Sequence, residues 1–88
     1  RDRFVTCLPN TDLETALAHL EHLRRQVEML EVYHNSQRIE LTASLGAAMY
    51  YKEFGVDTDA YLGRADDFLY RAKLDRNCVR SEISERIE

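Results

Sequence analysis

Apolar and polar side chains alternate most regularly between Arg38 and Tyr50. The apolar members occupy every second position of this stretch: Ile39, Leu41, Ala43, Leu45, Ala47 and Met49. This period of two predicts a strand with one face on a core. From Ser44 onward both faces are small or apolar, which is typical of a strand that enters the middle of a sheet. Gly46 lies inside this run, where a glycine indicates a bulge or a close approach of another backbone.

Two segments with helical spacing flank this strand. Residues 11–14 have the form of a capping box, in which the Thr11 hydroxyl and the Glu14 carboxylate bind free backbone N–H groups at a helix start. The apolar stripe that follows, at spacings of three and four, predicts a helix of roughly five turns. The stripe consists of Leu13, Ala16, Leu17, Leu20, Leu23, Val27 and Leu30. Asp57 or Thr58 should cap a second helix. Its buried side should be formed by Tyr61, Leu62, Ala65, Phe68, Leu69 and Ala72.

Shorter strands complete the predicted fold. Phe4 to Leu8 is rich in β-formers and is stopped by Pro9 and Asn10, so we expect a strand there. Glu31 to His34 is expected to form a small hairpin with the start of the central strand, and Asn77 to Arg80 a last strand. The main order is then β-α-β-α-β, which predicts one α/β sandwich with crossover helices over residues 1–80. Residues 81–88 are interpreted as a polar C-terminal tail.

The composition of the chain argues against several classes of function. The chain has 88 residues, enough for one small domain, and a net charge of −4. That charge argues against a nucleic-acid partner, which needs clustered Lys and Arg. No apolar run approaches the roughly 20 residues that span a bilayer, so no membrane segment is expected. Cys7 and Cys78 lack metal-ligand spacing and are interpreted as reduced, buried thiols of a cytoplasmic protein. Because the chain opens at Arg1 without an initiator methionine, we expect it to be a piece of something longer.

Three segments carry motifs in a fixed order: LPNTDLETALAHLEHLRRQV, LTASLGAA and YLGRADDFLYRAKLDRN. The middle one has the form T-x-S-[LI]-G-x-A, and the last has L-x-x-A-D-x-x-L-Y-x-A-K followed by R-N. Together they resemble the C-terminal half of a GGDEF domain, the diguanylate cyclase family that makes cyclic di-GMP from two GTP. The resemblance runs from Phe4 to about Val79. It implies the α+β palm-like fold, ferredoxin-like in outline, that nucleotide cyclases share with polymerases.

The resemblance places the opening residues RDRF on the signature G-G-[DE]-E-F. It implies that Arg1 replaces a glycine beside the nucleotide phosphates and that Asp2 takes the place of a metal ligand, a carboxylate suited to Mg²⁺. Arg3 falls on the catalytic position that carries glutamate in the family. An arginine there can bind phosphate through two parallel hydrogen bonds, but it stays protonated and cannot act as a base. We therefore interpret the signature as degenerate.

The end of the second helix carries the other implied site residues. The family spaces its phosphate-contacting residues as A-K-x-x-G-R-N, which implies that Lys73 and Arg76 contact nucleotide phosphates. The stretch 72–77 in this chain is one residue shorter than the family spacing, and it lacks the glycine that would end the helix. The alternative is that Lys73 and Arg76 have no ligand and are simply cations at a helix C-terminus, a position that the helix macrodipole favours. Adjacent helical residues point about 100° apart, so Asp66 and Asp67 are interpreted as surface charge and not as a catalytic pair. The family has an A-D dipeptide at this place, which implies a structural role for Asp66 more than a catalytic one.

Three hypotheses follow. In the first, the chain is part of a diguanylate cyclase lineage. It is expected to be inactive as this fragment, because the family's guanine-reading residues and a further metal ligand precede the signature. An active form would use Mg²⁺ as its cofactor. In the second, it is a catalytically silent regulatory module that binds GTP or cyclic di-GMP or mediates dimerisation. The third is an unrelated α/β interaction domain. Open strand edges favour a homodimer or a place in a longer multidomain chain.

Overall fold

The computed structural model describes residues 3–50 and 57–82. This part of the chain forms two helices and four short strands. In chain order they are α1 (Leu13–Glu28), β1 (Val32–His34), β2 (Gln37–Ile39), β3 (Leu45–Gly46), α2 (Thr58–Asp75) and β4 (Val79–Arg80). β1 and β2 form an antiparallel hairpin, whereas β3 and β4 pair in parallel with α2 as the connection between them.

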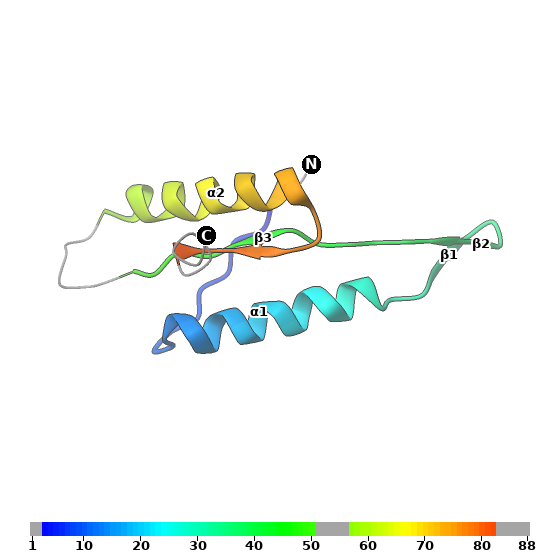
Figure 1. The fold of residues 1–88 in the computed structure, drawn as a ribbon, viewed down its shortest axis with the longest axis horizontal. Helices are drawn as coiled ribbons and strands as arrows, with labels where there is room; N and C mark the ends of the chain where they lie inside the picture. The colour runs from blue at the N-terminus through cyan, green and yellow to red at the C-terminus, as the bar shows by residue number, and fades with distance from the viewer. Residues whose placement is uncertain (1–2, 51–56, 83–88) are drawn as a thin grey trace.

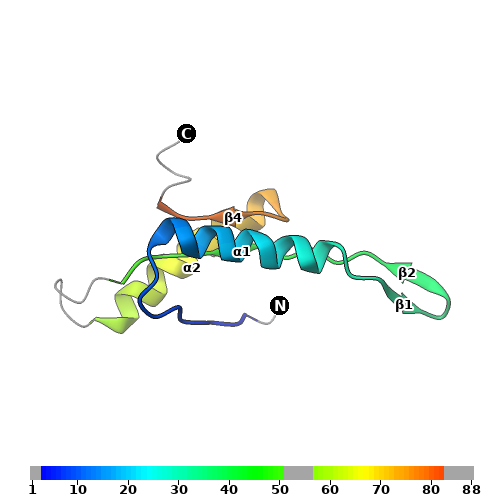
Figure 2. The same ribbon diagram turned by 90° about the horizontal axis from the view of Figure 1, so that it is seen from below.

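The elements form three layers around the β3–β4 pair. α2 packs on β3 and β4, and α1 contacts β4 from the opposite side, as Figure 1 shows. The β1–β2 hairpin projects beyond this α/β body in both views (Figures 1 and 2). Within the described residues, the buried apolar side chains come from both helices: Ala16, Leu20, Phe68 and Ala72. This mixed α/β arrangement is compatible with part of a cyclase palm fold, but the predicted β-α-β-α-β order is not confirmed.

α1 begins one residue later than the capping box predicts. The cap is Asp12, whose Oδ1 accepts a hydrogen bond from the Thr15 N–H at 2.7 Å, while the Thr11 hydroxyl donates to the Pro9 carbonyl at 2.9 Å. The bond from Thr15 also holds the pKa of the Asp12 carboxyl below its ordinary value. α1 then ends at Glu28, so the predicted stripe is too long, and Leu30 beyond it is exposed.

Two predicted strands are wrong in extent. Phe4 to Leu8 forms no strand: it has no hydrogen-bonded neighbour among the described residues, and Phe4 and Val5 are 92% and 77% exposed. The single strand over Arg38 to Tyr50 is also wrong, because only β2 and β3 form within it. β2 belongs to the projecting hairpin, where no helix covers it, and Ile39 remains 40% exposed. Strands form where a neighbouring strand pairs with them: β1 pairs with β2 and β4 pairs with β3, whereas Phe4 to Leu8 and the residues between β2 and β3 have no such partner in the described part of the chain.

The middle of the sandwich is short and tightly packed. The Leu45 N–H donates to the Cys78 carbonyl at 2.9 Å, and the Ala47 N–H donates to the Arg80 carbonyl at 3.0 Å. A Cβ placed on Gly46 would lie 2.2 Å from the Leu69 nitrogen, so the backbones of β3 and α2 are almost in contact. The close backbone approach predicted at Gly46 is therefore confirmed.

The ends of the sandwich also differ from expectation. Both cysteines are free, but Cys7 is exposed, which makes its predicted burial wrong; the segment that carries it joins no sheet. Cys78 is half-buried, and its thiol donates to the Ala72 carbonyl at 3.5 Å. At the start of the expected tail, Ser81 is buried and Glu82 forms an ion pair with Arg64. Residues 83–88 of that tail lie outside the described residues.

Candidate functional site

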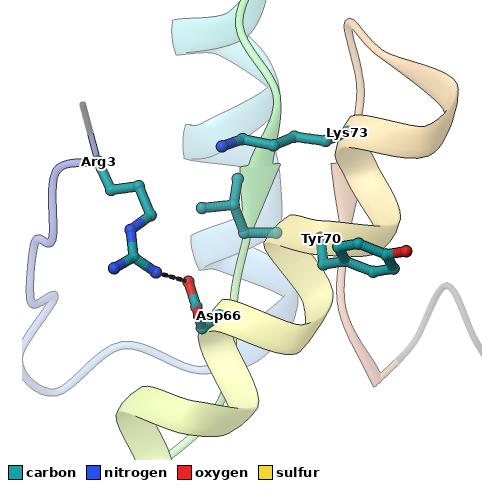
Figure 3. A pocket seen from close by; sticks show the side chains of 5 residues that line it. Arg3, Asp66, Tyr70 and Lys73 are labelled. Carbon is teal, nitrogen blue, oxygen red and sulfur yellow. Dashed lines mark hydrogen bonds and ion pairs between the residues drawn. The ribbon is translucent and has the colours of Figure 1, made fainter. Parts of the chain in front are cut away.

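A pocket of about 160 Å³ lies where the N-terminal segment passes α2. Arg3 contributes from that segment, and the other lining residues all come from α2: Asp66, Leu69, Tyr70 and Lys73. Spacings of three and four place these four side chains on one face of the helix. Figure 3 shows the pocket from close by.

Arg3 and Asp66 form an ion pair across the pocket. Arg3 Nη1 donates to Asp66 Oδ1 at 2.5 Å, and the two side chains are 58% and 50% exposed. At such exposure the ion pair adds at most about 1 kcal/mol to the free energy of unfolding. Its main effect is on the positions of the charged groups at the pocket. It fixes the guanidinium at the pocket and engages the carboxylate of Asp66. The sequence patterns gave no sign of this contact, which joins residues 63 positions apart.

Lys73 shares the pocket with Arg3. Its ammonium group reaches toward the side of the pocket from which Arg3 enters, whereas the Tyr70 ring points away from Arg3 (Figure 3). Two of the predicted site residues are thus brought together. Arg76 is exposed and does not line the pocket. Arg1 and Asp2 lie outside the described residues, so their predicted roles in phosphate and Mg²⁺ binding stay predictions.

The lining groups suit an anion better than a metal ion. Two cations and one carboxylate face the pocket, and the carboxylate of Asp66 is bound by Arg3. Mg²⁺ takes one or two carboxylates together with substrate phosphates. Across residues 3–50 and 57–82, no three His, Cys, Asp or Glu residues gather closely enough to hold a metal ion. The described residues therefore do not fit Mg²⁺, and no step below depends on it.

Sequence comparison decides the family. The profile of the family described as "Diguanylate cyclase, GGDEF domain" matches residues 1–78. The chain belongs to the GGDEF family. It is also 30% identical over 73 residues to Diguanylate cyclase A of Treponema denticola, which is 82% of this chain and 19% of that relative. The chain thus spans about a fifth of the relative's length. In the part of this GGDEF chain that the structure describes, no helix is long and apolar enough to cross a membrane.

The end of α2 shows how this GGDEF chain manages without the expected glycine. Arg76 has φ 65° and ψ 151°, and its N–H donates to the Ala72 carbonyl at 2.7 Å. Asn77 follows with φ 52°. The conformation of Arg76 belongs to a region that is essentially reserved for glycine. The turn out of α2 thus still needs a glycine-like backbone, and Arg76 provides it under strain.

Replacing Arg76 by glycine should therefore stabilise the protein. We expect the free energy of unfolding to rise by about 1 kcal/mol, because the strain is relieved at a modest cost in chain entropy. Urea unfolding followed by circular dichroism measures the change. Leu74→Gly is the matched control: it puts glycine into the last turn of the same helix at an exposed position and should cost about 1 kcal/mol. A loss of stability in Arg76→Gly would contradict the strained turn.

A second polar cluster, which the sequence analysis missed, joins α1 to this turn. Arg24 donates to both Glu21 oxygens at 2.9 and 2.6 Å, to Glu28 at 3.3 Å and to the Asn77 Oδ1 at 2.7 Å. Its side chain is only 13% exposed. The hydrogen bond with Glu21 raises the pKa of Arg24 and lowers the pKa of the Glu21 carboxyl from their ordinary values. We call Arg24, Glu28 and Asn77 the clasp. Spacing on α1 predicts its Arg–Glu pairs, but no local rule predicts a partner 53 residues away.

Proposed function

We propose that this chain acts in cyclic di-GMP signalling as a GGDEF segment that binds the phosphates of a guanine nucleotide but does not catalyse cyclisation. The observation that carries the proposal is the meeting of Arg3 and Lys73 at one pocket. Asp66 offsets one of the two cations, which leaves the pocket with an excess positive charge. Membership of the GGDEF family supports GTP as the nucleotide, since the matched relative is named as a diguanylate cyclase.

The charges at the pocket favour a silent site over an active one. The family's glutamate position is occupied by Arg3, whose guanidinium stays protonated and cannot accept a proton. Asp66 has one of its two carboxylate oxygens, Oδ1, bound by the Arg3 guanidinium, which weakens it as a base or a metal ligand. Asp2 is the residue that the family pattern would assign to Mg²⁺. The pocket thus neutralises phosphate charge, which suits nucleotide binding within a larger regulatory protein.

Lys73→Ala tests the proposal. The variant should bind GTP at least about tenfold more weakly in isothermal titration calorimetry, because a charge-assisted bond to phosphate is lost. Arg38→Ala is the matched control, since it removes an exposed cation from the projecting hairpin. Lys73→Arg should retain most of the affinity. Equal affinities of Lys73→Ala and the unsubstituted protein would refute phosphate binding at this pocket.

A further inference from the structure

We propose that the clasp is a positioning device for the nucleotide site: Arg24 and Glu28 hold Asn77, and Asn77 in turn fixes the end of α2 that presents Lys73. This inference rests on the proposed function, because Lys73 is taken as the phosphate-binding residue. None of the three clasp residues lines the pocket, so each would act through Lys73 and not by touching the nucleotide.

Asn77 is bound from several directions. Its Nδ2 donates to Glu28 Oε2 at 2.7 Å, its Oδ1 accepts from Arg24 Nη1 at 2.7 Å, and its backbone N–H donates to the Ser44 hydroxyl at 3.2 Å. The amide therefore uses both its donor and its acceptor side on charged partners, which makes these bonds stronger than neutral ones. Ser44 adds an anchor immediately before β3.

The clasp acts where the backbone most needs support. Arg76 and Asn77 both have positive φ, and such residues persist only where the surroundings hold them in place. The support comes from α1, which lies on the opposite side of the β3–β4 pair from α2 (Figure 1). The clasp thus spans the end of the sandwich and joins the two helix layers.

Lys73 lies in the last turn of α2, four residues before Asn77, and it reaches the pocket from that turn. Asn77 lies two residues beyond the end of α2 at Asp75. The intervening Arg76 is tied back to the last helical turn, because its N–H donates to the Ala72 carbonyl at 2.7 Å, so a shift at Asn77 is passed through this turn to the neighbouring Lys73. Positioning of this kind matters because a displacement of about 1 Å at a binding group can change function by up to 10²-fold. Within the clasp the Arg24 side chain is 13% exposed and that of Glu28 is 46% exposed, so salt screens the contacts of Arg24 less than those of an ordinary surface pair.

Two variants break the clasp and leave Lys73 in place. Asn77→Gly removes the amide but keeps a residue that accepts positive φ, and Arg24→Ala removes the guanidinium. We expect each to bind GTP about tenfold more weakly in calorimetry of the intact gene product, at a temperature where circular dichroism shows it folded. In a Lys73→Ala background, Asn77→Gly should change the affinity by less than about twofold, since the two residues act as one unit.

The controls are matched to each variant. Asn35→Gly replaces an asparagine with φ 51° in the hairpin turn, and Arg25→Ala removes the neighbouring exposed cation of α1; both should bind GTP as the unsubstituted protein does. If Lys73→Ala weakens binding but Asn77→Gly and Arg24→Ala do not, the clasp has only a structural role and the inference is overturned. If Lys73→Ala itself has no effect, the proposed function fails and the inference fails with it.

Discussion

Replacing Gly46 by alanine should lower the free energy of unfolding by about 3 kcal/mol, because the added methyl group has no space. The new Cβ would lie 2.2 Å from the Leu69 nitrogen and 2.6 Å from the Ala65 carbonyl oxygen. Both atoms belong to the backbone of α2, which cannot rotate away as a side chain would. Accommodation therefore requires α2 to move off β3, and this contact forms much of the sandwich.

Gly63→Ala is the matched control for this prediction. Gly63 lies inside α2, and a Cβ there would meet no atom within 4 Å. The same methyl group should therefore raise the free energy of unfolding by about 1 kcal/mol, through the higher helix propensity of alanine. Urea unfolding of the two variants side by side measures the difference. Equal and small effects would show that α2 does not sit on β3 as closely as described.

The second large effect concerns turnover. We expect no detectable cyclic di-GMP when the intact gene product is incubated with GTP and Mg²⁺, because the proposed alignment puts the cation of Arg3 where the family carries a carboxylate. Arg3→Glu should bring product formation above the detection limit, since a restored acid–base group contributes roughly 10²-fold or more to the rate. The substitution also removes the ion pair with Asp66, and Lys73 then stands beside two carboxylates. Chromatography of the reaction mixture measures the product.

Arg3→Gln separates the two effects of that substitution. It releases Asp66 and removes the positive charge, but it supplies no proton acceptor. Product formation should therefore remain as low as in the unsubstituted protein. Cyclic di-GMP made by the unsubstituted protein would contradict the silent site outright. If Arg3→Glu remains inactive, Arg3 is not the limiting defect and the alignment of the opening residues on the signature must be revised.

Local sequence patterns predicted the helices well. The apolar spacing placed α2, and one of the two proposed caps for it is the observed Asp57. Phe68 and Ala72 are buried as expected, whereas the predicted burial of Leu62 is wrong, since it is 46% exposed. The cap of α1 was displaced by one residue because Thr11 and Asp12 are both good caps, and their spacing alone does not distinguish them.

Long-range features could not be read from the sequence in the same way. A period of two reports that two faces differ, but it does not say whether a helix covers either face. One continuous strand with one face on the core was therefore predicted where β2 and β3 form separately. At the site, Lys73 was found through the family motif, whereas the Arg3–Asp66 pair and the clasp join residues far apart in the sequence. Such contacts depend on how the layers assemble, which no local spacing encodes.

The central place of β4 has a consequence for how the protein is made. Both helix layers pack on this strand, yet its residues Val79 and Arg80 follow the other elements that the structure describes. On the ribosome, α1, the hairpin and α2 can each begin to form from local contacts as they emerge. The interior of the sandwich stays open until β4 has left the exit tunnel. A nascent chain is therefore expected to be prone to aggregation during the interval between the synthesis of α2 and the release of β4.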